Sequence, residues 1–589
     1  MSTSFGGHTT ALRLFRARAA AWGKLPALRH KEFGIWQTVT WAGYEAAVRG
    51  VARSLHALGA RPGEVSAVLS LNRPEWLYAD LGAQHLGMIG AGIYPTSSPE
   101  QVLHVLADSG ATIVFVEDAE QLDKVLRVRA DCPRLRHIVV FDMTGLRGLD
   151  DAMVLSFADF LALGEAVPDA AIDAPLEAAA GADIAMLIYT SGTTGASKGA
   201  MISHANIMFQ IATAAAQTPL QLGDHTVSFL PLCHVAERMG TVFNPLAHGP
   251  IVHFPESAAT LYNDLPEIAP HLLFAPPRFW EKLHARVTLF MPDAIAPARL
   301  LYALALRHPG RLLDWLVLRN LRTSLGLGSL RHAVTGAAPV SPDMLAWFRT
   351  LGVNLVEAYG LTETVGFCTA TPQGDARPGR AGLPVAGTEV RLGAEDEILV
   401  RGPSVFAGYW GNPAATAAAI GADGWLHTGD CGSFDADGHL AIRDRIKDII
   451  ITSGGKNISP SQIENTLKFS PYISDAVVVG EGRNYLCCLV LPDPETTAQF
   501  AQDQQLTYTD QSSLMRLPEV VALIGREIEQ ANRSFARVEQ IKDFRLIEEI
   551  LTPDDEEVTP TLKLKRRLVS RRYAALINAM YGGANPVST

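Results

Sequence analysis

Residues 189–204 read YTSGTTGASKGAMISH, and this segment constrains the fold and function of the chain more than any other. Its three glycines free backbone N–H groups, its hydroxyl side chains add further donors, and Lys198 supplies an ammonium group. Such groups can together surround a polyanion such as a phosphate chain. An apolar run precedes the segment and the helix-like run MISHANIMFQIATAAAQ follows it. We therefore predict a phosphate-binding loop between a strand and a helix, with a flexible linker as the alternative.

The loop differs from the P-loop of nucleotide triphosphatases. That motif has glycine directly before its lysine and Ser or Thr directly after it, whereas Ser197 precedes Lys198 and Gly199 follows it. The candidate phosphate contacts are Thr190, Ser191, Gly192, Thr193, Thr194, Gly195 and Lys198.

Composition excludes several classes of function. A chain of 589 residues is too long for a single hydrophobic core. The net charge of −11 argues against a nucleic-acid partner. The six cysteines show no CxxC spacing, which argues against a zinc site or a disulfide framework and favours a reducing compartment. We find no signal peptide and no membrane-spanning segment, so we expect a cytoplasmic protein.

A basic run near the C-terminus suggests a second kind of partner. Residues 563–567 read KLKRR, and Arg571 and Arg572 follow. This cluster could contact an anionic membrane surface, and a solvated helix face is the alternative. We expect at most peripheral membrane contact.

The periodicity of the N-terminal part indicates an α/β fold. Apolar residues recur at three- and four-residue steps over residues 41–58, after Thr40 as N-cap and before Gly59, which predicts an amphipathic helix. Residues 65–71 and 111–118 read as buried strands, with a helical stretch at 75–88 between them. This order predicts a parallel sheet covered by helices.

The pattern changes after about residue 440. A β-branched run and a Gly-Gly turn lead into a helix with Ser459 as N-cap and Pro460 at its first position. Two strand-like segments and a long helix near 519–536 follow, which predicts a small α+β unit. We predict a large N-terminal domain over residues 1–444 and a small, mobile C-terminal domain over residues 445–589.

Five further segments carry polar residues at the ends of apolar runs. They are LPLCHVAER (230–238), TGAAPVS (335–341), EAYGLTET (357–364), DGWLHTGD with DRIKD (423–430 and 444–448), and TPTLKLKRR (559–567). Together with the loop at 189–204 they resemble, in order and spacing, motifs of the AMP-forming acyl and aryl adenylating enzymes. The resemblance covers roughly residues 30 to 570.

The resemblance implies roles for the ATP-binding residues. Gly336 and Ala337 would form one wall of the adenine pocket and Tyr359 would stack on the base. Thr362 would contact the α-phosphate. Glu363 would hold Mg²⁺, which fits the need of a hard cation for carboxylate oxygen, although a Thr-Glu pair more often caps a helix. The ribose hydroxyls would bind Asp430 and Arg445.

The resemblance also implies roles in catalysis and domain movement. His234 would lie beside the carboxylate substrate, Lys447 would be the hinge, and Gly455 would border the passage of the CoA pantetheine arm. Lys563 would reach the carboxylate and the α-phosphate as the catalytic cation. Leucine stands where the usual motif has glycine before this lysine, so Lys565 is a second candidate.

These roles predict an ATP-dependent ligase that joins a long-chain fatty acid to coenzyme A through an acyl adenylate, with Mg²⁺ as cofactor. Alternatives are a fatty acyl-AMP ligase that loads a carrier protein and a synthetase for medium-chain or aryl acids. A luciferase-type oxygenase fits less well. A non-enzymatic lipid-binding protein is disfavoured because the charged site residues are all present. The sequence leaves open whether the protein is a monomer or a homodimer.

Overall fold

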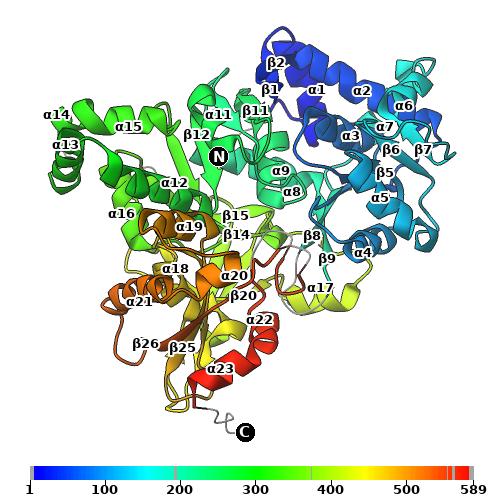
Figure 1. Cartoon of the computed structure of the whole chain (residues 1–589). Helices are drawn as coiled ribbons and strands as arrows, with labels where there is room; N and C mark the ends of the chain where they lie inside the picture. Colours follow the sequence, from blue (N-terminus) through cyan, green and yellow to red (C-terminus); the bar gives the residue numbers. More distant parts are fainter. Residues whose placement is uncertain are drawn as a thin grey trace.

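The computed structural model describes residues 5–190, 196–308, 310–372, 374–552, 555–559 and 564–582. The chain forms a large body from the N-terminus to about residue 440 and a smaller C-terminal body that packs against it (Figure 1). The α/β fold class predicted from the sequence is confirmed.

The largest sheet has eight strands in the order β19-β9-β8-β4-β3-β5-β6-β7. Their bounds are β3 Val65–Leu69, β4 Ile89–Ile93, β5 Ala111–Val116, β6 His137–Val140, β7 Val154–Ser156, β8 Ile184–Thr190, β9 Lys198–Ser203 and β19 Gly408–Tyr409. The six strands from β8 to β7 in this order pair in parallel. The predicted strand, helix, strand order is therefore confirmed, although the sequence analysis overlooked β4.

Helices cover both faces of this sheet. They are α1 Ala11–Trp22, α2 Trp41–Ala57, α3 Pro74–His85, α4 Pro99–Ser109, α5 Ala119–Val128, α6 Phe157–Leu163, α7 Asp169–Ala178 and α8 His204–Gln217. The predicted cap of α2 is confirmed, because the side chain of Thr40 accepts the N–H of Gly43. Trp41 on α2, Trp76 on α3 and Phe115 on β5 are fully or nearly fully buried in one hydrophobic cluster.

One local prediction is wrong. The segment after the phosphate-binding loop is strand β9, which pairs antiparallel with β8 from Thr190 opposite Lys198 to Ile184 opposite Ser203. The helix α8 begins only at His204, where Ser203 forms a capping box with Asn206. Pairing with β8 on one side and β19 on the other outweighs the helix-like pattern predicted to begin at Met201. The loop therefore joins two strands of a hairpin.

The second large sheet has five strands, β12 Leu272–Ala275, β13 His332–Thr335, β14 Leu355–Leu361, β15 Gly366–Ala370 and β16 Leu383–Pro384. The first three pair in parallel and the last two add in antiparallel fashion. Helices α11 Leu261–Ile268, α12 Pro277–Phe290, α13 Ala296–Arg307, α14 Arg311–Leu313, α15 Arg319–Ser324 and α16 Pro342–Thr350 belong to this region. The carboxyl ends of β13 and β14 carry the segments TGAAPVS and EAYGLTET.

Two four-stranded sheets complete the large body. One contains β1 Pro26–Glu32, β2 Ile35–Thr40, β10 His225–Val227 and β11 Ile251–Phe254, and the other contains β17 Glu389–Leu392, β18 Glu397–Arg401, β20 Leu426–Phe434 and β21 Leu440–Arg445. The remaining helices are α9 Val235–Arg238, α10 Pro245–His248 and α17 Pro413–Ala419.

The C-terminal body has hydrophobic clusters of its own. It contains β22 Ile450–Ile451, β23 Asn457–Ile458, β24 Ile473–Val479, β25 Leu486–Pro492, β26 Ile541–Leu546, α18 Pro460–Leu467, α19 Pro494–Asp503, α20 Gln511–Met515, α21 Pro518–Asn532, α22 Arg566–Arg572 and α23 Ala574–Met580. Two clusters consist only of residues from Ile450 onward. The predicted α+β character of this part is therefore confirmed. The boundary at residues 444 and 445 stays a prediction.

The start of α18 differs in detail from the prediction. Ser459 is the N-cap, but its hydroxyl donates to Oδ2 of Asp444 at 2.6 Å instead of accepting a helix N–H. The same carboxylate oxygen accepts the N–H of Ser461 at 3.0 Å. Asp444 at the end of β21 thus caps α18 from outside the helix.

Two arginines of the C-terminal basic run, Arg566 and Arg572, form ion pairs within the chain. Arg566 donates two hydrogen bonds to the buried carboxylate of Glu464 and one to the carbonyl of Val478. Arg572 forms ion pairs with three carboxylates, among them Glu557 at 2.8 Å. Among the described residues, no helix combines the length and apolarity that crossing a membrane requires.

Candidate active site

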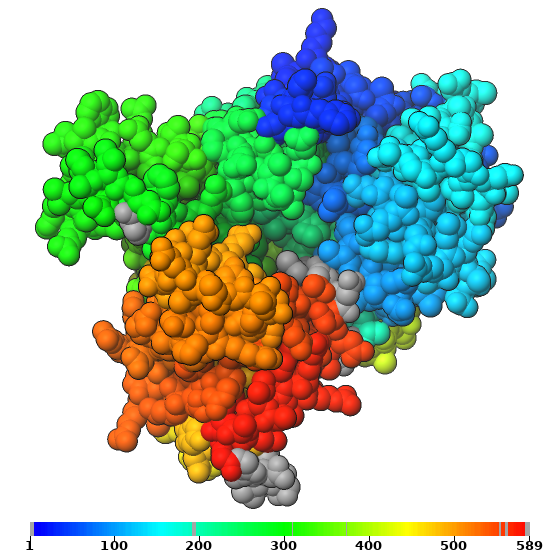
Figure 2. Space-filling view, in the orientation of Figure 1, coloured from blue at the N-terminus to red at the C-terminus, as the bar shows by residue number. Residues whose placement is uncertain are grey.

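A cleft of about 2090 Å³ lies where the carboxyl ends of the strands meet the C-terminal body. Figure 2 shows the orange and red C-terminal residues packed against the green and blue parts of the chain. Eleven of the predicted site residues line the cleft: Thr190, Lys198, His234, Gly336, Ala337, Tyr359, Thr362, Glu363, Asp430, Arg445 and Lys447. Residues 191–195 and Lys563 lie outside the described residues. Gly455 does not line the cleft.

The turn after β13 brings the backbone close to β14. A Cβ atom added to Gly336 would lie 2.9 Å from the carbonyl oxygen of Ala358 and 3.3 Å from the ring of Phe274. Ala337 has a φ of +66°, which side chains rarely adopt. Glycine at position 336 is therefore required by the close approach, and the turn leaves a flat backbone wall beside Tyr359.

Tyr359, Asp430 and Arg445 form a connected group. The hydroxyl of Tyr359 donates to Oδ2 of Asp430 at 2.7 Å, and Nε of Arg445 lies 3.4 Å from Oδ1. Asp430 and Arg445 are direct partners on the neighbouring strands β20 and β21. Burial raises the pKa of Asp430, and Arg445 opposes this change. The group thus presents an oriented carboxylate that can accept hydrogen bonds from a diol.

Glu363 follows β14 in a short 3₁₀ turn with Thr362. Its Oε1 accepts a hydrogen bond of 2.7 Å from the hydroxyl of Tyr409, and the ammonium of Lys198 lies 5.1 Å from the centre of the same tyrosine ring. No cluster of three or more candidate metal ligands occurs among the described residues. A single carboxylate fits Mg²⁺, which commonly binds through one or two carboxylates together with substrate phosphates.

His234 lies at the start of α9 and lines the cleft. Its Nδ1 accepts the N–H of Ala236 at 3.2 Å, which orients the ring. The same motif contains two fully buried charged side chains. Arg238 pairs with Asp80 beneath the ring of Trp76. Burial raises the pKa of Glu237 to about 7.

The C-terminal body contributes one edge of the cleft. Thr559, Leu564 and Arg566 line it on either side of the predicted catalytic Lys563. Lys565 is not among the lining residues, and its backbone N–H donates to the carbonyl of Glu557 at 2.7 Å. Gly455 lies in an exposed turn with a φ of +72°. Residues on either side of position 563 therefore line the cleft together with parts of α18, and Asn457 is the lining residue nearest in sequence to Gly455.

Comparison with known proteins identifies the family. The model of the AMP-binding enzyme family matches residues 15–410, and the model of the AMP-binding enzyme C-terminal domain matches residues 447–585. The chain belongs to the AMP-binding enzyme family.

Curated relatives and solved structures agree with this assignment. The long-chain-fatty-acid–CoA ligase FadD15 of Mycobacterium bovis is 35% identical over 571 residues, which are 93% of each chain. The human long-chain-fatty-acid–CoA ligase ACSBG1 is 32% identical over 97% of this chain and 85% of its own. The adenylation domain of a carboxylate reductase from Mycobacterium chelonae superposes with a TM-score of 0.79 at 22% identity, over 97% of this chain and 91% of that one.

In this AMP-binding enzyme, contacts between α12 and the C-terminal body hold the cleft in its observed form. Arg278 donates to the backbone carbonyl and the hydroxyl of Ser474 at 2.7 and 2.8 Å. His284 stacks on Phe469 with ring centres 4.6 Å apart. Burial raises the pKa of Glu281 to about 7, and the nearby cation Lys468 opposes this change.

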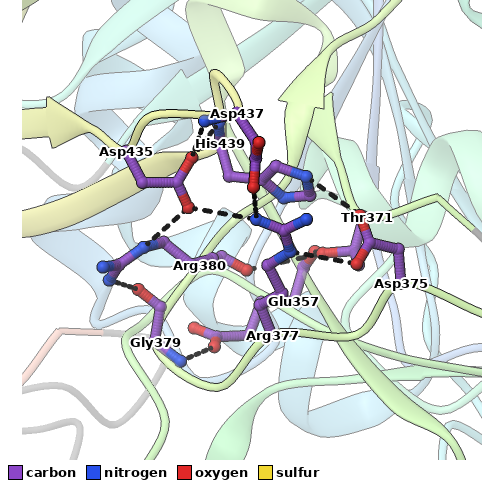
Figure 3. A network of polar contacts seen from close by, with 9 residues as sticks. All are labelled: Glu357, Thr371, Asp375, Arg377, Gly379, Arg380, Asp435, Asp437 and His439. Carbon is purple, nitrogen blue, oxygen red and sulfur yellow. Dashed lines mark hydrogen bonds and ion pairs between the residues drawn. The ribbon is translucent and has the colours of Figure 1, made fainter.

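A polar network lies beside another part of the cleft wall and is shown in Figure 3. Oε1 of Glu357 accepts the N–H of Gly379 at 2.9 Å. Arg380 lies 3.4 Å from Asp435, which begins the tight turn between β20 and β21. Further contacts join Arg377 with Asp375, Asp435 and Asp437, and His439 with Asp375. Gly379 and Arg380 line the cleft, so this network holds one wall in place.

The sequence analysis missed Tyr409, Glu357 and Arg278. Tyr409 follows Gly408, whose φ of +126° requires glycine, and this Gly-Tyr pair was the only local signal for it. Glu357 lies in the segment EAYGLTET, in which the family resemblance implies no role for it. Burial raises its pKa to about 7, with the N–H groups of Gly379 and Arg380 opposing the change.

Proposed function

We propose that this AMP-binding enzyme ligates a long-chain fatty acid to coenzyme A in two steps. In the first step an oxygen of the fatty carboxylate attacks the α-phosphorus of ATP and pyrophosphate leaves, which gives an acyl adenylate. In the second step the thiol of CoA attacks the acyl carbonyl, AMP leaves, and the thiol proton is released. The first step is needed because a free carboxylate has no good leaving group.

One observation carries the proposal. The cleft is lined by Lys198, Glu363 and Asp430, which would serve as a phosphate-binding cation, a metal ligand and a diol-binding carboxylate. ATP needs each of these groups along its length. A bound Mg²⁺ would neutralise charge on the phosphates of ATP. The choice of a long-chain acid rests on the curated relatives, which are named as ligases of such acids.

The residues have the following proposed roles. Tyr359 and the wall at Gly336 would hold adenine, Asp430 and Arg445 would bind the ribose, and Thr362 with Lys198 would contact phosphates. His234 would position the carboxylate, and Lys563 would stabilise the charge that accumulates when carboxylate and phosphate meet. Thr190 and residues 191–195 would supply further phosphate contacts.

The two steps would use two orientations of the C-terminal body. In the present arrangement Thr559, Leu564 and Arg566, which flank Lys563 in the sequence, line the cleft, and this arrangement would suit adenylation. A rotation about Lys447 would exchange this segment for the turn at Gly455, which would border the path of the pantetheine arm. We also propose a cytoplasmic location with access to membrane surfaces.

The test is ATP-dependent thioester formation across acids of two to twenty carbons, with CoA and a carrier-protein phosphopantetheine compared as acceptors. We expect the highest kcat/KM for long-chain acids with CoA. Preference for the carrier protein would identify an acyl-AMP ligase, and a maximum at medium-chain or aryl acids would refute the proposed substrate class.

A further inference from the structure

A helical arm projects from the large body beside the second sheet. It consists of α13, α14, a π-helical turn at Asp314–Leu318 and α15. Figure 1 shows these helices at the outer edge of the molecule, and the space-filling view shows the same green segment extending away from the rest of the chain (Figure 2).

The inner side of the arm packs into a hydrophobic core of the large body. Ala305 and Leu318 are buried in one hydrophobic cluster with Leu261 and Phe279. The latter two also line the cleft. The arm is therefore a packed part of the fold, and its inner face is attached to a wall of the active site.

The outer side of the arm is also apolar. On α13, Leu300 and Leu304 are 61% and 39% exposed. On the following helical segment, Leu312 and Trp315 are 68% and 61% exposed, and the neighbouring Leu316 is 41% exposed. Steps of three and four residues place each of these sets on a single helix face. The two segments pack against each other, and exposed apolar side chains on such neighbouring helices mark an interaction site.

Arginines flank the apolar side chains. Residues 296–324 contain five arginines and one aspartate, in a chain with a net charge of −11. Arg307 and Arg319 continue the exposed faces by one turn, and Arg311 lies at the bend between the helices. These three side chains form no ion pair with any residue that the structure describes, whereas Asp314 is paired with Arg322.

We propose that the outer face of this arm docks on an anionic lipid surface. Leu300, Leu304, Leu312, Trp315 and Leu316 would enter the boundary between headgroups and acyl chains, and the flanking arginines would meet lipid phosphates. The charge decides between this occupant and a second copy of the chain. A two-fold contact through this face would place the same unpaired arginines close to one another.

The biological purpose of this docking rests on the proposed function, because long-chain acids partition into bilayers and the arm packs against a wall of the cleft. The test itself is independent of that function. The protein is sedimented with vesicles of phosphatidylcholine alone and of phosphatidylcholine with phosphatidylglycerol. In L312E/W315E, two apolar side chains that would be buried in the lipid are lost, so binding to the anionic vesicles should weaken at least about tenfold. The double variant R307E/R311E should also bind less and lose its dependence on salt.

Matched controls lie elsewhere on the surface. F33E/I35E replaces two apolar side chains that are 88% and 63% exposed. R533E/R537E reverses two exposed arginines near the end of α21. Both controls should bind anionic vesicles like the wild type. All four variants should convert a water-soluble octanoate to its thioester within about twofold of the wild-type rate.

Three outcomes would overturn the inference. They are failure of the wild type to bind anionic vesicles, equal loss in the control and arm variants, and light scattering that shows a dimer dissociated by L312E/W315E. Absence of thioester formation in every protein, with vesicle binding intact, would instead refute the proposed function and leave the docking surface in place.

Discussion

The hydroxyl of Tyr409 donates a 2.7 Å hydrogen bond to Oε1 of Glu363, and its ring lies 5.1 Å from the ammonium of Lys198. Tyr409 thus links the proposed metal ligand to the lysine that follows the phosphate-binding loop. It belongs to the short strand β19, which pairs with β9, the strand that carries Lys198. This link orients both charged groups before any ligand binds.

Tyr409→Phe should therefore raise the Mg²⁺ requirement of adenylation. A hydrogen bond to a charged group is worth about 1.5–3 kcal/mol, so the Mg²⁺ concentration for half-maximal pyrophosphate exchange should increase about tenfold. Tyr302→Phe is the matched control, because its hydroxyl accepts a hydrogen bond of 3.2 Å from Trp347 in the arm region and does not line the cleft. An unchanged Mg²⁺ dependence in the Tyr409 variant would remove its proposed role.

The sequence predicted features whose signals are local. The cap of α2 at Thr40 and the strand, helix, strand order depend on residues a few positions apart, and they are confirmed. The strand β9 was missed because its pairing with β8 and β19 overrides a helical periodicity. Tyr409, Glu357 and Asp444 were missed for a related reason. Their partners lie 46, 22 and 15 residues away in the chain, and only the fold brings them together.

The carboxylate of Asp430 should be required for ATP binding. Asp430→Ala removes the acceptor of the Tyr359 hydroxyl and the partner of Arg445, so ATP affinity should fall at least about tenfold. Asp430→Asn keeps an oxygen acceptor without the charge and should be less impaired. Titration calorimetry with ATP checks both Asp430 variants, and unchanged affinity with full turnover would refute the ribose assignment.

Glu363→Ala should depress pyrophosphate exchange through loss of the metal ligand.

Glu281 should make the protein less stable as pH rises. Burial raises its pKa from an ordinary value of 4.5 to about 7, despite Lys468 and Arg278 nearby, and Asp475 adds to the increase. A raised folded-state pKa gives stability that is fully present below pH 4.5 and is lost as pH rises through 7. Glu281→Gln lacks this loss and should gain about 2 kcal/mol on the wild type between pH 5 and pH 7.5.

Denaturant unfolding at several pH values measures this difference. Glu529→Gln, on the exposed face of α21, is the control and should follow the wild type at every pH. A constant difference between Glu281→Gln and the wild type would show that the carboxyl of Glu281 titrates as in the unfolded chain.

Lys563→Ala should lower the carboxylate-dependent pyrophosphate-exchange rate by at least about 10², the scale of one lost electrostatic donor. Thioester formation from supplied acyl adenylate should continue, because that step is assigned to the other face of the C-terminal body. Lys565→Ala is the control, since Lys565 does not line the cleft. If Lys565→Ala shows the loss and Lys563→Ala does not, the catalytic lysine is the second one.

Gly455→Leu should separate the two half-reactions. Gly455 lies in an exposed turn and does not line the cleft, and a Cβ there would meet no atom within 4 Å. Pyrophosphate exchange should therefore stay near the wild-type rate, while transfer of the acyl group to CoA falls steeply because the side chain blocks the pantetheine path.

The φ of +72° at Gly455 adds backbone strain of about 1 kcal/mol in Gly455→Leu. Gly454→Leu controls for bulk in the same turn without a positive φ, and Gly455→Asn controls for strain, because asparagine tolerates this conformation. Equal loss of both half-reactions in Gly455→Leu, with a lowered Tm, would make Gly455 a structural residue and would leave the rotation about Lys447 without support.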